Sequence, residues 1–378
     1  MRHFIFLIAL LLAAGCDDAE ANLQFERVAL SETTFEAAAV FDVNNDGHLD
    51  IVSGENWFPG PDFSQAVKIT DVMPEGDYFD DFADFPMDID GDGFLDIVSG
   101  AWFGQKLTWR ENPDGQPVEW TVRDIAVIGN VERPNFWDID GDGHVDIAPN
   151  TPSRPQRIFR LNRDAQGNPL GTFLEHTISP NITGHGLGFG DINGDRRGDL
   201  IVWNGWFEAP AQPFAQEWTW HEGPALFDSA SVPTLVHDVN SDGLNDIIVG
   251  AGHNFGLAWW EQGAGLTWTR HDIVTDRSQF HEMALADLDN DGTPELVTGK
   301  RWRAHPAGDP GGEDPVGLYY FDLNGGDFVM HTLDFGPGET AAGTGIYLWV
   351  ADVDGNGWQD IVAPGKGGLY LFKNLGRQ

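Results

Sequence analysis

Seven acidic segments of the chain share one spacing of oxygen-bearing side chains. Each has Asp, Asn or Glu at positions 1, 3, 5 and 9 and usually glycine at position 6, as in DIDGDGFLD from Asp88. Alternate residues of a tight turn point to one centre, and hard oxygen atoms arranged in this way suit Ca²⁺. The expected calcium ligands are Asp42, Asn44, Asp46 and Asp50; Asp88, Asp90, Asp92 and Asp96; Asp138, Asp140, Asp142 and Asp146; Asp191, Asn193, Asp195 and Asp199; Asp238, Asn240, Asp242 and Asp246; Asp287, Asp289, Asp291 and Glu295; Asp352, Asp354, Asn356 and Asp360. The alternative is that the segments are only Asp- and Gly-rich turns.

The seven segments are not expected to bind calcium equally. In the fourth segment Arg196 stands where glycine would permit the positive φ of the turn, and Arg197 follows it. In the seventh segment Asn356 at position 5 removes one negative charge. We therefore expect weak or absent calcium at the fourth segment.

The elements that position these segments recur with them. The segments start 46 to 65 residues apart, and each lies between two short apolar runs such as DIIVG. Two further strand-like runs complete each period, as in LAWWEQ and TWTRHDI. Four short strands in about 50 residues describe a propeller blade. The sequence therefore predicts an all-β, seven-bladed β-propeller with a calcium loop between the first and second strands of each blade.

The two ends of the chain are expected to meet. After Asp360 only two more strands follow, whereas residues 24–30 have the pattern of a fourth strand. An N-terminal strand that completes the last blade would close the ring and remove an open sheet edge. The alternative is an unclosed β-solenoid with the same loops.

The N-terminus resembles a bacterial lipoprotein signal. An apolar run over residues 4–14 is too short to span a membrane as a stable helix, and small residues directly precede Cys16. The resemblance implies a signal peptide at 1–15, lipidation of Cys16, a tether at 16–23 and the propeller at 24–378. The expected location is outside the cytoplasm, on a membrane facing the periplasm or at the cell surface. A plainly secreted protein is the alternative.

Composition restricts the partners. Sixty Asp and Glu against 21 Lys and Arg give a net charge of −39, which argues against nucleic acid or an anionic membrane surface. With 41% hydrophobic residues and 15 Trp the chain can build a core. A single cysteine excludes internal disulfides, so an exported chain needs another source of stability, and metal ions are the obvious one. Oligomeric state stays open.

Three histidines are expected near the central channel. His185 and His281 stand six positions before the first aspartate of the fourth and sixth segments, where the innermost strand begins. His253 follows the second strand of the fifth blade, whose end reaches the same face. Three neutral imidazoles with a vacant fourth position are the arrangement of a catalytic zinc ion. Alternatively these polar residues only line a wet channel.

The chain resembles two families. The acidic spacing resembles the FG-GAP and VCBS repeats of integrin-type and bacterial surface propellers over nearly the whole mature chain. The segments GHGLGFGD, GHNFGLAWWEQ, FHEMALADLDNDG and GKRWRAH resemble the propeller domain of fungal aldos-2-ulose dehydratases. That resemblance implies a zinc ion on His185, His253 and His281 and an elimination on a keto-sugar. Glu132 stands where the family has an acid/base histidine, and the family's cupin and lectin domains are absent.

The expected chemistry is a carbon–oxygen lyase reaction on a keto-sugar or saccharide. Zinc would acidify a C–H bond beside a carbonyl, and Glu132 or Glu282 would accept the proton. Lys300 and Arg301 would stabilise the enolate. Trp206 and Trp302 would stack on a sugar ring or pack between blades. The alternatives are a non-catalytic propeller that binds a protein or glycan, and a quinone-dependent redox propeller.

Overall fold

The computed structural model describes residues 22–180, 186–227, 233–305 and 308–377. All regular structure in these residues is β-strand, so the all-β prediction is confirmed for them. No helix of the described residues is long and apolar enough to cross a membrane.

The strands form antiparallel groups of four, here called units, and two of these units are joined through one parallel strand pair into an eight-stranded sheet. Unit 1 holds β2 (Ala39–Phe41), β3 (Asp50–Ser53), β4 (Asn56–Phe58) and β5 (Val67–Lys68). Unit 2 holds β8 (Phe85–Met87), β9 (Asp96–Ala101), β10 (Lys106–Glu111) and β11 (Thr121–Val127). Unit 3 holds β12 (Asn135–Trp137), β13 (Asp146–Ala148), β14 (Gln156–Arg163) and β15 (Pro169–Ser179). A small hairpin of β6 (Pro74–Glu75) and β7 (Tyr78–Phe79) lies between units 1 and 2.

The second half of the chain repeats this order. Unit 4 holds β16 (Gly188–Gly190), β17 (Asp199–Val202), β18 (Gly205–Glu208) and β19 (Thr219–Glu222). Unit 5 holds β20 (Thr234–His237), β21 (Asp246–Gly250), β22 (Phe255–Gly263) and β23 (Thr267–Ser278). Unit 6 holds β24 (Phe280–Ala286), β25 (Glu295–Lys300), β26 (Val316–Asn324) and β27 (Asp327–Gly336). Unit 7 holds β28 (Trp349–Ala351), β29 (Asp360–Ala363), β30 (Leu369–Arg377) and the N-terminal β1 (Leu23–Ser31).

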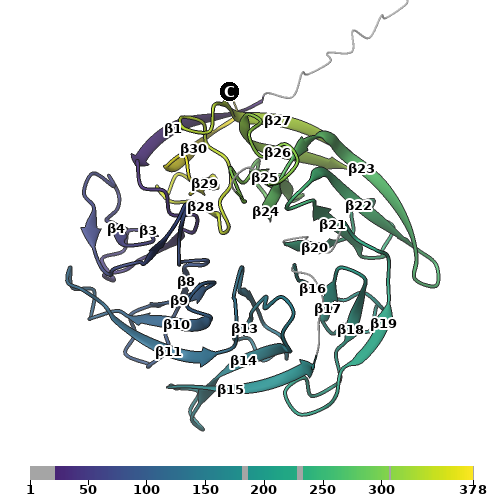
Figure 1. Cartoon of the computed structure of the whole chain (residues 1–378), viewed down its shortest axis with the longest axis horizontal. Coiled ribbons are helices and arrows are strands. Elements are labelled where there is room, and N and C mark those ends of the chain that lie inside the picture. Colours follow the sequence, from purple (N-terminus) through teal and green to yellow (C-terminus); the bar gives the residue numbers. More distant parts are fainter. Residues whose placement is uncertain (1–21, 181–185, 228–232, 306–307, 378) are drawn as a thin grey trace, which may run out of the picture.

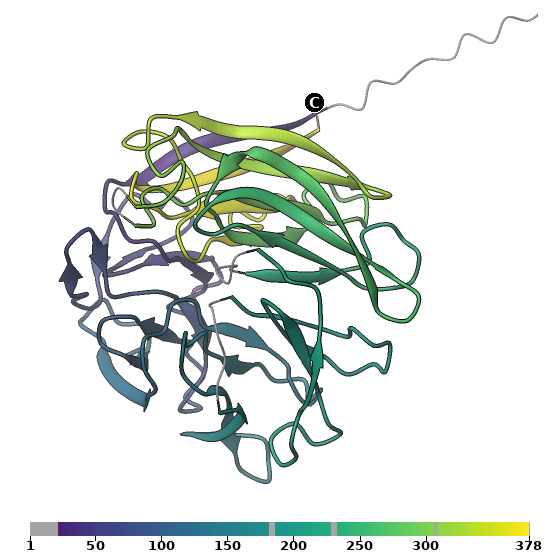
Figure 2. The same ribbon diagram turned by 45° about the vertical axis from the view of Figure 1, so that its right-hand side comes forward.

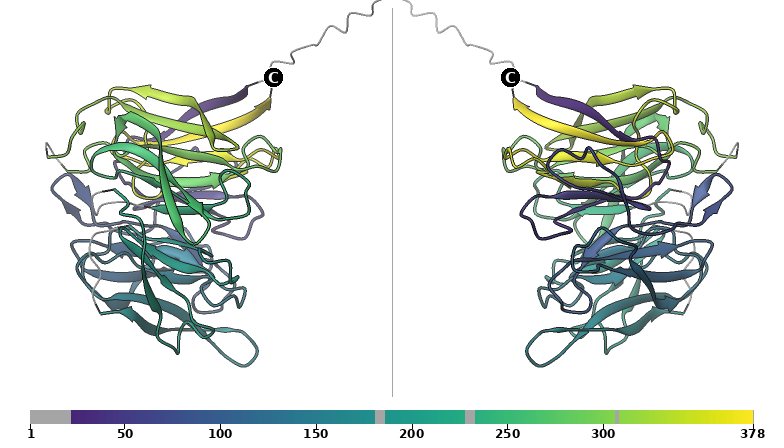
Figure 3. Two further views of the ribbon diagram at one scale, coloured as in Figure 1. Left: turned by 90° about the vertical axis from the view of Figure 1, so that its right-hand side faces the viewer. Right: turned by 90° about the vertical axis from the view of Figure 1, so that its left-hand side faces the viewer.

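The units are arranged in a ring. Figure 1 shows the first strands, such as β8, β16, β20 and β24, near the centre and the fourth strands, such as β11, β15 and β23, at the outside. β1 pairs antiparallel with β30, from Leu23 opposite Arg377 to Ser31 opposite Leu369. The side views in Figures 2 and 3 show the purple N-terminal strand beside the yellow C-terminal strand.

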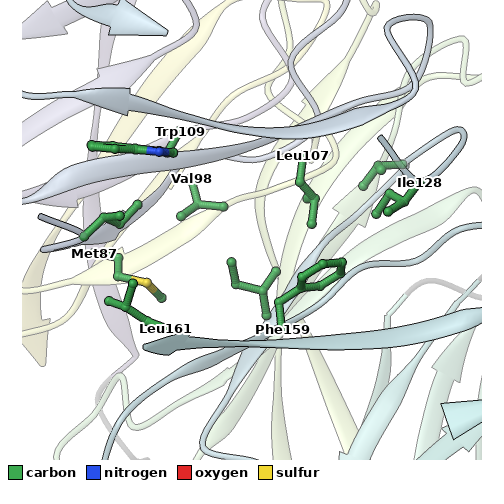
Figure 4. Close-up of a cluster of buried hydrophobic side chains, with 10 residues drawn as sticks. Met87, Val98, Leu107, Trp109, Ile128, Phe159 and Leu161 are labelled. Atoms are coloured by element: carbon green, nitrogen blue, oxygen red, sulfur yellow. The ribbon is translucent and has the colours of Figure 1, made fainter. Parts of the chain in front are cut away.

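Apolar side chains of the middle strands fill the space between neighbouring units. Val98 and Leu107 of unit 2 are fully buried against Phe159 and Leu161 of unit 3, as Figure 4 shows. Each such side chain contributes about 1.5–3 kcal/mol by leaving water. The second strands are buried on both faces, which explains why they read as continuous apolar runs.

Side-chain amides at the ends of third strands also join the units. Asn112, directly after β10, donates a hydrogen bond from Nδ2 to the carbonyl oxygen of Val43 in unit 1, 2.9 Å away. The same contact recurs between Gln262 and Ile192 (3.1 Å) and between Asn374 and Leu288 (2.8 Å). Each acceptor is position 2 of an acidic segment, so these amides connect one segment to the next unit.

Candidate functional site

The acidic segments form turns that their own side chains hold. In the first segment, the carboxylate of Asp42 accepts hydrogen bonds from the backbone N–H groups of Asp46 and Gly47, at 3.0 and 2.8 Å. Positions 4 and 6 take a positive φ in all seven segments, and position 6 is glycine except at Arg196, where φ is 69°. Arg196 thus adopts a conformation that glycine adopts without a steric penalty.

The carboxylate at position 9 is buried in every segment. It accepts the backbone N–H of position 2, as Asp50 does from Val43 at 2.9 Å. Burial raises the pKa of these carboxyl groups. The pKa is about 6 for Asp199, Asp246 and Asp360, about 7 for Asp96 and Glu295, and about 8 for Asp146. A nearby cation would favour the charged form of each group.

In some segments an arginine or lysine of the protein forms an ion pair with one of the carboxylates. Arg160 of β14 pairs with Asp140 at 2.5 Å, and Lys373 of β30 pairs with Asp354 at 3.6 Å. Arg197 pairs with Asp195 in the fourth segment, and Arg377 pairs with Asp289 in the sixth. Carboxylate oxygens lie within 4.8 Å of one another in three sets: Asp88, Asp90 and Asp96; Asp138, Asp140 and Asp146; Asp287, Asp289 and Asp291. Carboxylate oxygens are among the donors that calcium takes, so each set offers part of the six to eight oxygen ligands that the ion requires.

Near the centre of the ring, side chains of three units converge. Glu132 precedes β12 of unit 3, His253 follows β21 of unit 5, and His281 lies in β24 of unit 6. One ligand atom of each lies within 4.8 Å of the others. Nε2 of His281 is 3.0 Å from Oε1 of Glu132, and the rings of His253 and His281 are 5.3 Å apart between centroids. We call these three residues the central cluster.

A buried arginine lies against the central cluster. Nη1 of Arg301, directly after β25, is 3.0 Å from Nε2 of His281 and 3.4 Å from Oε1 of Glu132. Its Nε and Nη2 donate to the two carboxylate oxygens of Glu36, at 2.8 and 3.1 Å. Two carboxylates therefore surround one guanidinium group that is 2% exposed.

The electrostatic surroundings of His281 keep its ring neutral. Burial, and then the positive charge of Arg301, hold the pKa of His281 well below its usual range. Its Nε2 faces Glu132 and Arg301, whereas its buried Nδ1 has no hydrogen-bond partner among the described residues. A neutral imidazole is the form of histidine that coordinates zinc.

His253 contacts a carboxylate through one of its ring nitrogens, as metal-binding histidines commonly do. Its Nδ1 lies 3.0 Å from Oδ2 of Asp309. The ring of His305 stacks on His253 at 4.4 Å, and its Nδ1 lies 3.1 Å from the same carboxylate oxygen. A carboxylate on Nδ1 directs Nε2 toward a metal ion. The two imidazoles of His253 and His281 are donors of the kind that zinc takes.

Not all of the residues named from the sequence can be placed at the central cluster. His185 and Cys16 lie outside the described residues. Glu282 is not brought to the central cluster, because Nε and Nη2 of Arg133 bind its carboxylate at 2.5 and 2.7 Å. Nζ of Lys300 donates to Oγ of Ser278 at 3.3 Å. Lys300 lines a separate cavity of about 140 Å³ and not the one beside Arg301, because successive residues of a strand point to opposite faces.

The two tryptophans expected either to stack on a sugar or to pack between blades contact other side chains of the protein. Trp206 is buried and stacks on His221 at 4.2 Å. The guanidinium carbon of Arg303 lies over the ring of Trp302, 4.3 Å from the centroid of that ring.

A cavity of about 250 Å³ opens beside the central cluster. Glu132, Arg301 and His305 form its polar part. The rest of its described lining is Tyr78, Phe82, Trp102, Phe103 and Ala304. The carboxylate of Glu132 is therefore shared by the central cluster and the cavity.

Sequence reasoning missed four contributors to this region. Glu36 occupies the same place before its segment as Glu132, and Trp102 follows a second strand as His253 does, so the repeat register could have found both. Asp309 and Tyr78 lie in connections that no other unit repeats, and no sequence signal marks them.

Two parts of the chain match a known repeat type. The FG-GAP-like repeat matches residues 88–148 and 238–298, and each match contains two consecutive acidic segments. The chain therefore carries FG-GAP-like repeats in a propeller-like all-β fold. Among solved structures, it is similar to the V. cholerae biofilm matrix protein Bap1, with 11% identity and a TM-score of 0.45 over 95% of this chain and 89% of that one. The comparison with curated proteins gave no match.

Proposed function

We propose that this chain is an exported, calcium-stabilised, seven-bladed β-propeller whose centre holds a zinc-dependent carbon–oxygen lyase for a keto-sugar or saccharide. The observation that carries the proposal is the convergence of Glu132, His253 and His281 within 4.8 Å. The pairing of β1 with β30 supports a closed ring. The three carboxylate sets of the acidic segments support calcium as the stabilising ion.

The residues of the central cluster have distinct parts in the proposed reaction. His253 and His281, with His185 as a further candidate, would hold zinc, which supplies Lewis acidity toward a substrate carbonyl. Glu132 faces the cavity and accepts the proton from the carbon beside that carbonyl. The electrons of the broken C–H bond form a C=C bond, the neighbouring C–O bond breaks, and the leaving oxygen takes up a proton. Arg301, with Nη1 3.4 Å from Oε1 of Glu132, stabilises negative charge that develops beside it.

The FG-GAP-like repeats favour a second candidate function. In this alternative the same calcium-stabilised propeller is not an enzyme and presents its loops to a protein or glycan at the cell surface. The repeat match over residues 88–148 and 238–298 is the observation in its favour.

An elimination assay separates the two functions. The purified mature protein, supplied with zinc, is incubated with 1,5-anhydrofructose and with 3-keto-glycosides, and an unsaturated product is followed by its ultraviolet absorbance. We expect product with the wild type and with His48→Asn, an exposed position in the first segment, and a loss of product with Glu132→Gln and His281→Ala. Absence of product from all substrates, with zinc bound, would favour the non-catalytic function.

A further inference from the structure

The aromatic part of the cavity beside Glu132 comes from two connections that hold their rings together. Trp102 and Phe103 lie in the turn between β9 and β10, and Tyr78 lies in the β6–β7 hairpin. The rings of Tyr78 and Phe103 are 5.8 Å apart, and Phe82 supports Trp102 at 6.4 Å. Phe103 is 39% exposed. These rings therefore present aromatic surface to the cavity and are not fully used in packing.

Residues of units 6 and 7 hold the β6–β7 hairpin. Oη of Tyr78 donates a hydrogen bond to the carbonyl oxygen of Ala304, 2.5 Å away. Asp77 pairs with Arg303 at 3.0 Å and with Lys366 at 3.3 Å. Nζ of Lys366 also lies 4.0 Å from the centroid of the Tyr78 ring. Residues of units 6 and 7 therefore hold Tyr78 in place as one wall of the cavity.

The polar part of the cavity carries no excess of positive charge. Glu36 and Glu132 both contact Arg301, so one guanidinium group is matched by two carboxylates. An anionic ligand would meet the carboxylate of Glu132 without a spare cation among the described lining residues. Glu132 and Arg301 instead offer an acceptor and a donor to hydroxyl or carbonyl groups.

The dimensions of the cavity indicate a small ligand. Its volume of about 250 Å³ lies below the range of about 300–1,000 Å³ that is typical of sites for drug-sized ligands. An apolar wall facing a few polar groups suits a molecule with one apolar face and one polar edge. A neutral sugar ring has this shape, with C–H bonds on its face and oxygen atoms at its rim.

We propose that Tyr78, Trp102 and Phe103 form a subsite for one neutral pyranose ring and direct its oxygen-bearing edge to Glu132 and Arg301. The subsite rests on the proposed function, because it names the ring that the same site would act on. Beyond the proposed function, the subsite specifies that the bound sugar is neutral, that a single ring is bound, and which residues stack on that ring.

Calorimetric titration of the full mature protein with 1,5-anhydroglucitol, an unreactive neutral ring, tests the subsite. We expect binding to the wild type, a loss of affinity of about tenfold in Trp102→Ala, and near wild-type affinity in Trp102→Phe. Trp220→Phe, at a 43% exposed tryptophan on β19, is the matched control and should bind normally. Thermal unfolding of each variant verifies that it is folded.

Three results would overturn the subsite. These are no binding of the neutral ring, unchanged affinity in Trp102→Ala, or tighter binding of glucuronate, choline or cellobiose than of 1,5-anhydroglucitol. The outcome is separable from that of the lyase proposal. Sugar binding without zinc or elimination would leave the subsite standing and remove the lyase. Elimination by the wild type, with an unchanged KM in Trp102→Ala, would leave the lyase standing and remove the subsite.

Discussion

Arg301 and Glu36 lie 265 positions apart in the chain and form a two-point ion pair, with Nε 2.8 Å from Oε1 and Nη2 3.1 Å from Oε2. The side chains are 2% and 5% exposed. Since Arg301 also contacts Glu132 and His281, units 1, 3 and 6 meet at one buried cation. The geometry of the central cluster therefore depends on the ring as a whole.

Removing this cation should destabilise the fold. Arg301→Gln leaves the buried carboxylates of Glu36 and Glu132 without compensation, and we expect the free energy of unfolding to fall by about 3–5 kcal/mol. Arg303→Gln breaks a pair with Asp77 that is about one-third exposed and should cost less than about 1 kcal/mol. Denaturant titration of both variants measures the difference. Equal losses would contradict a special role for Arg301.

The partner of His253 should control metal affinity. Asp309→Ala removes the carboxylate from Nδ1 of His253, so we expect zinc affinity to fall by about 10–100-fold. Glu313→Gln changes an exposed acid nearby and should leave the affinity unchanged. Competition with a chromophoric chelator measures both. Wild-type affinity in Asp309→Ala would mean that this carboxylate does not orient a zinc ligand.

Arg160, which pairs with Asp140 of the third acidic segment, should compete with calcium for that carboxylate. Arg160→Gln frees Asp140, and we expect calcium affinity to rise by roughly 1 kcal/mol in binding free energy. Arg157→Gln is the matched control on the same strand, because Arg157 pairs with Glu175 and not with an acidic segment. Calcium titration followed by calorimetry compares the two variants. A decrease in affinity in Arg160→Gln would argue against an ion at this segment.

The buried position-9 carboxyl groups give the calcium-free protein a defined pH dependence. In six of them the pKa of about 6 to 8 exceeds the unfolded value of about 4, and burial also raises the pKa of Asp50, so the folded state binds more protons between these limits. Stability without calcium should therefore fall as the pH rises from about 4 to about 8. Calcium should raise the melting temperature more at pH 8 than at pH 5. Thermal unfolding at both pH values checks this, and a calcium-free protein that becomes more stable across this window would contradict it.

The repeat pattern made the strands and their FG-GAP-like character predictable. Each acidic segment has the same spacing and lies between apolar runs. The same pattern therefore predicts a turn between two buried strands in every repeat. His253, His281 and Glu132 could be nominated because each occupies a fixed place relative to its segment. The structure brings these three together.

Other features depend on contacts between units. Glu282 and Lys300 have suitable chemistry, but Arg133 and Ser278 bind them away from the central cluster, and no local pattern reveals those partners. Asp309 and Tyr78 lie in connections without a repeat register. Their positions follow only from contacts between units.

The metal content of the purified mature protein tests the central claim most directly. After dialysis against excess calcium, elemental analysis should find close to one zinc per chain. The zinc should be lost in His253→Ala and His281→Ala, while His48→Asn should retain it. A wild-type protein that remains folded, contains calcium and holds no zinc under these conditions would contradict the account of the central cluster as a zinc site.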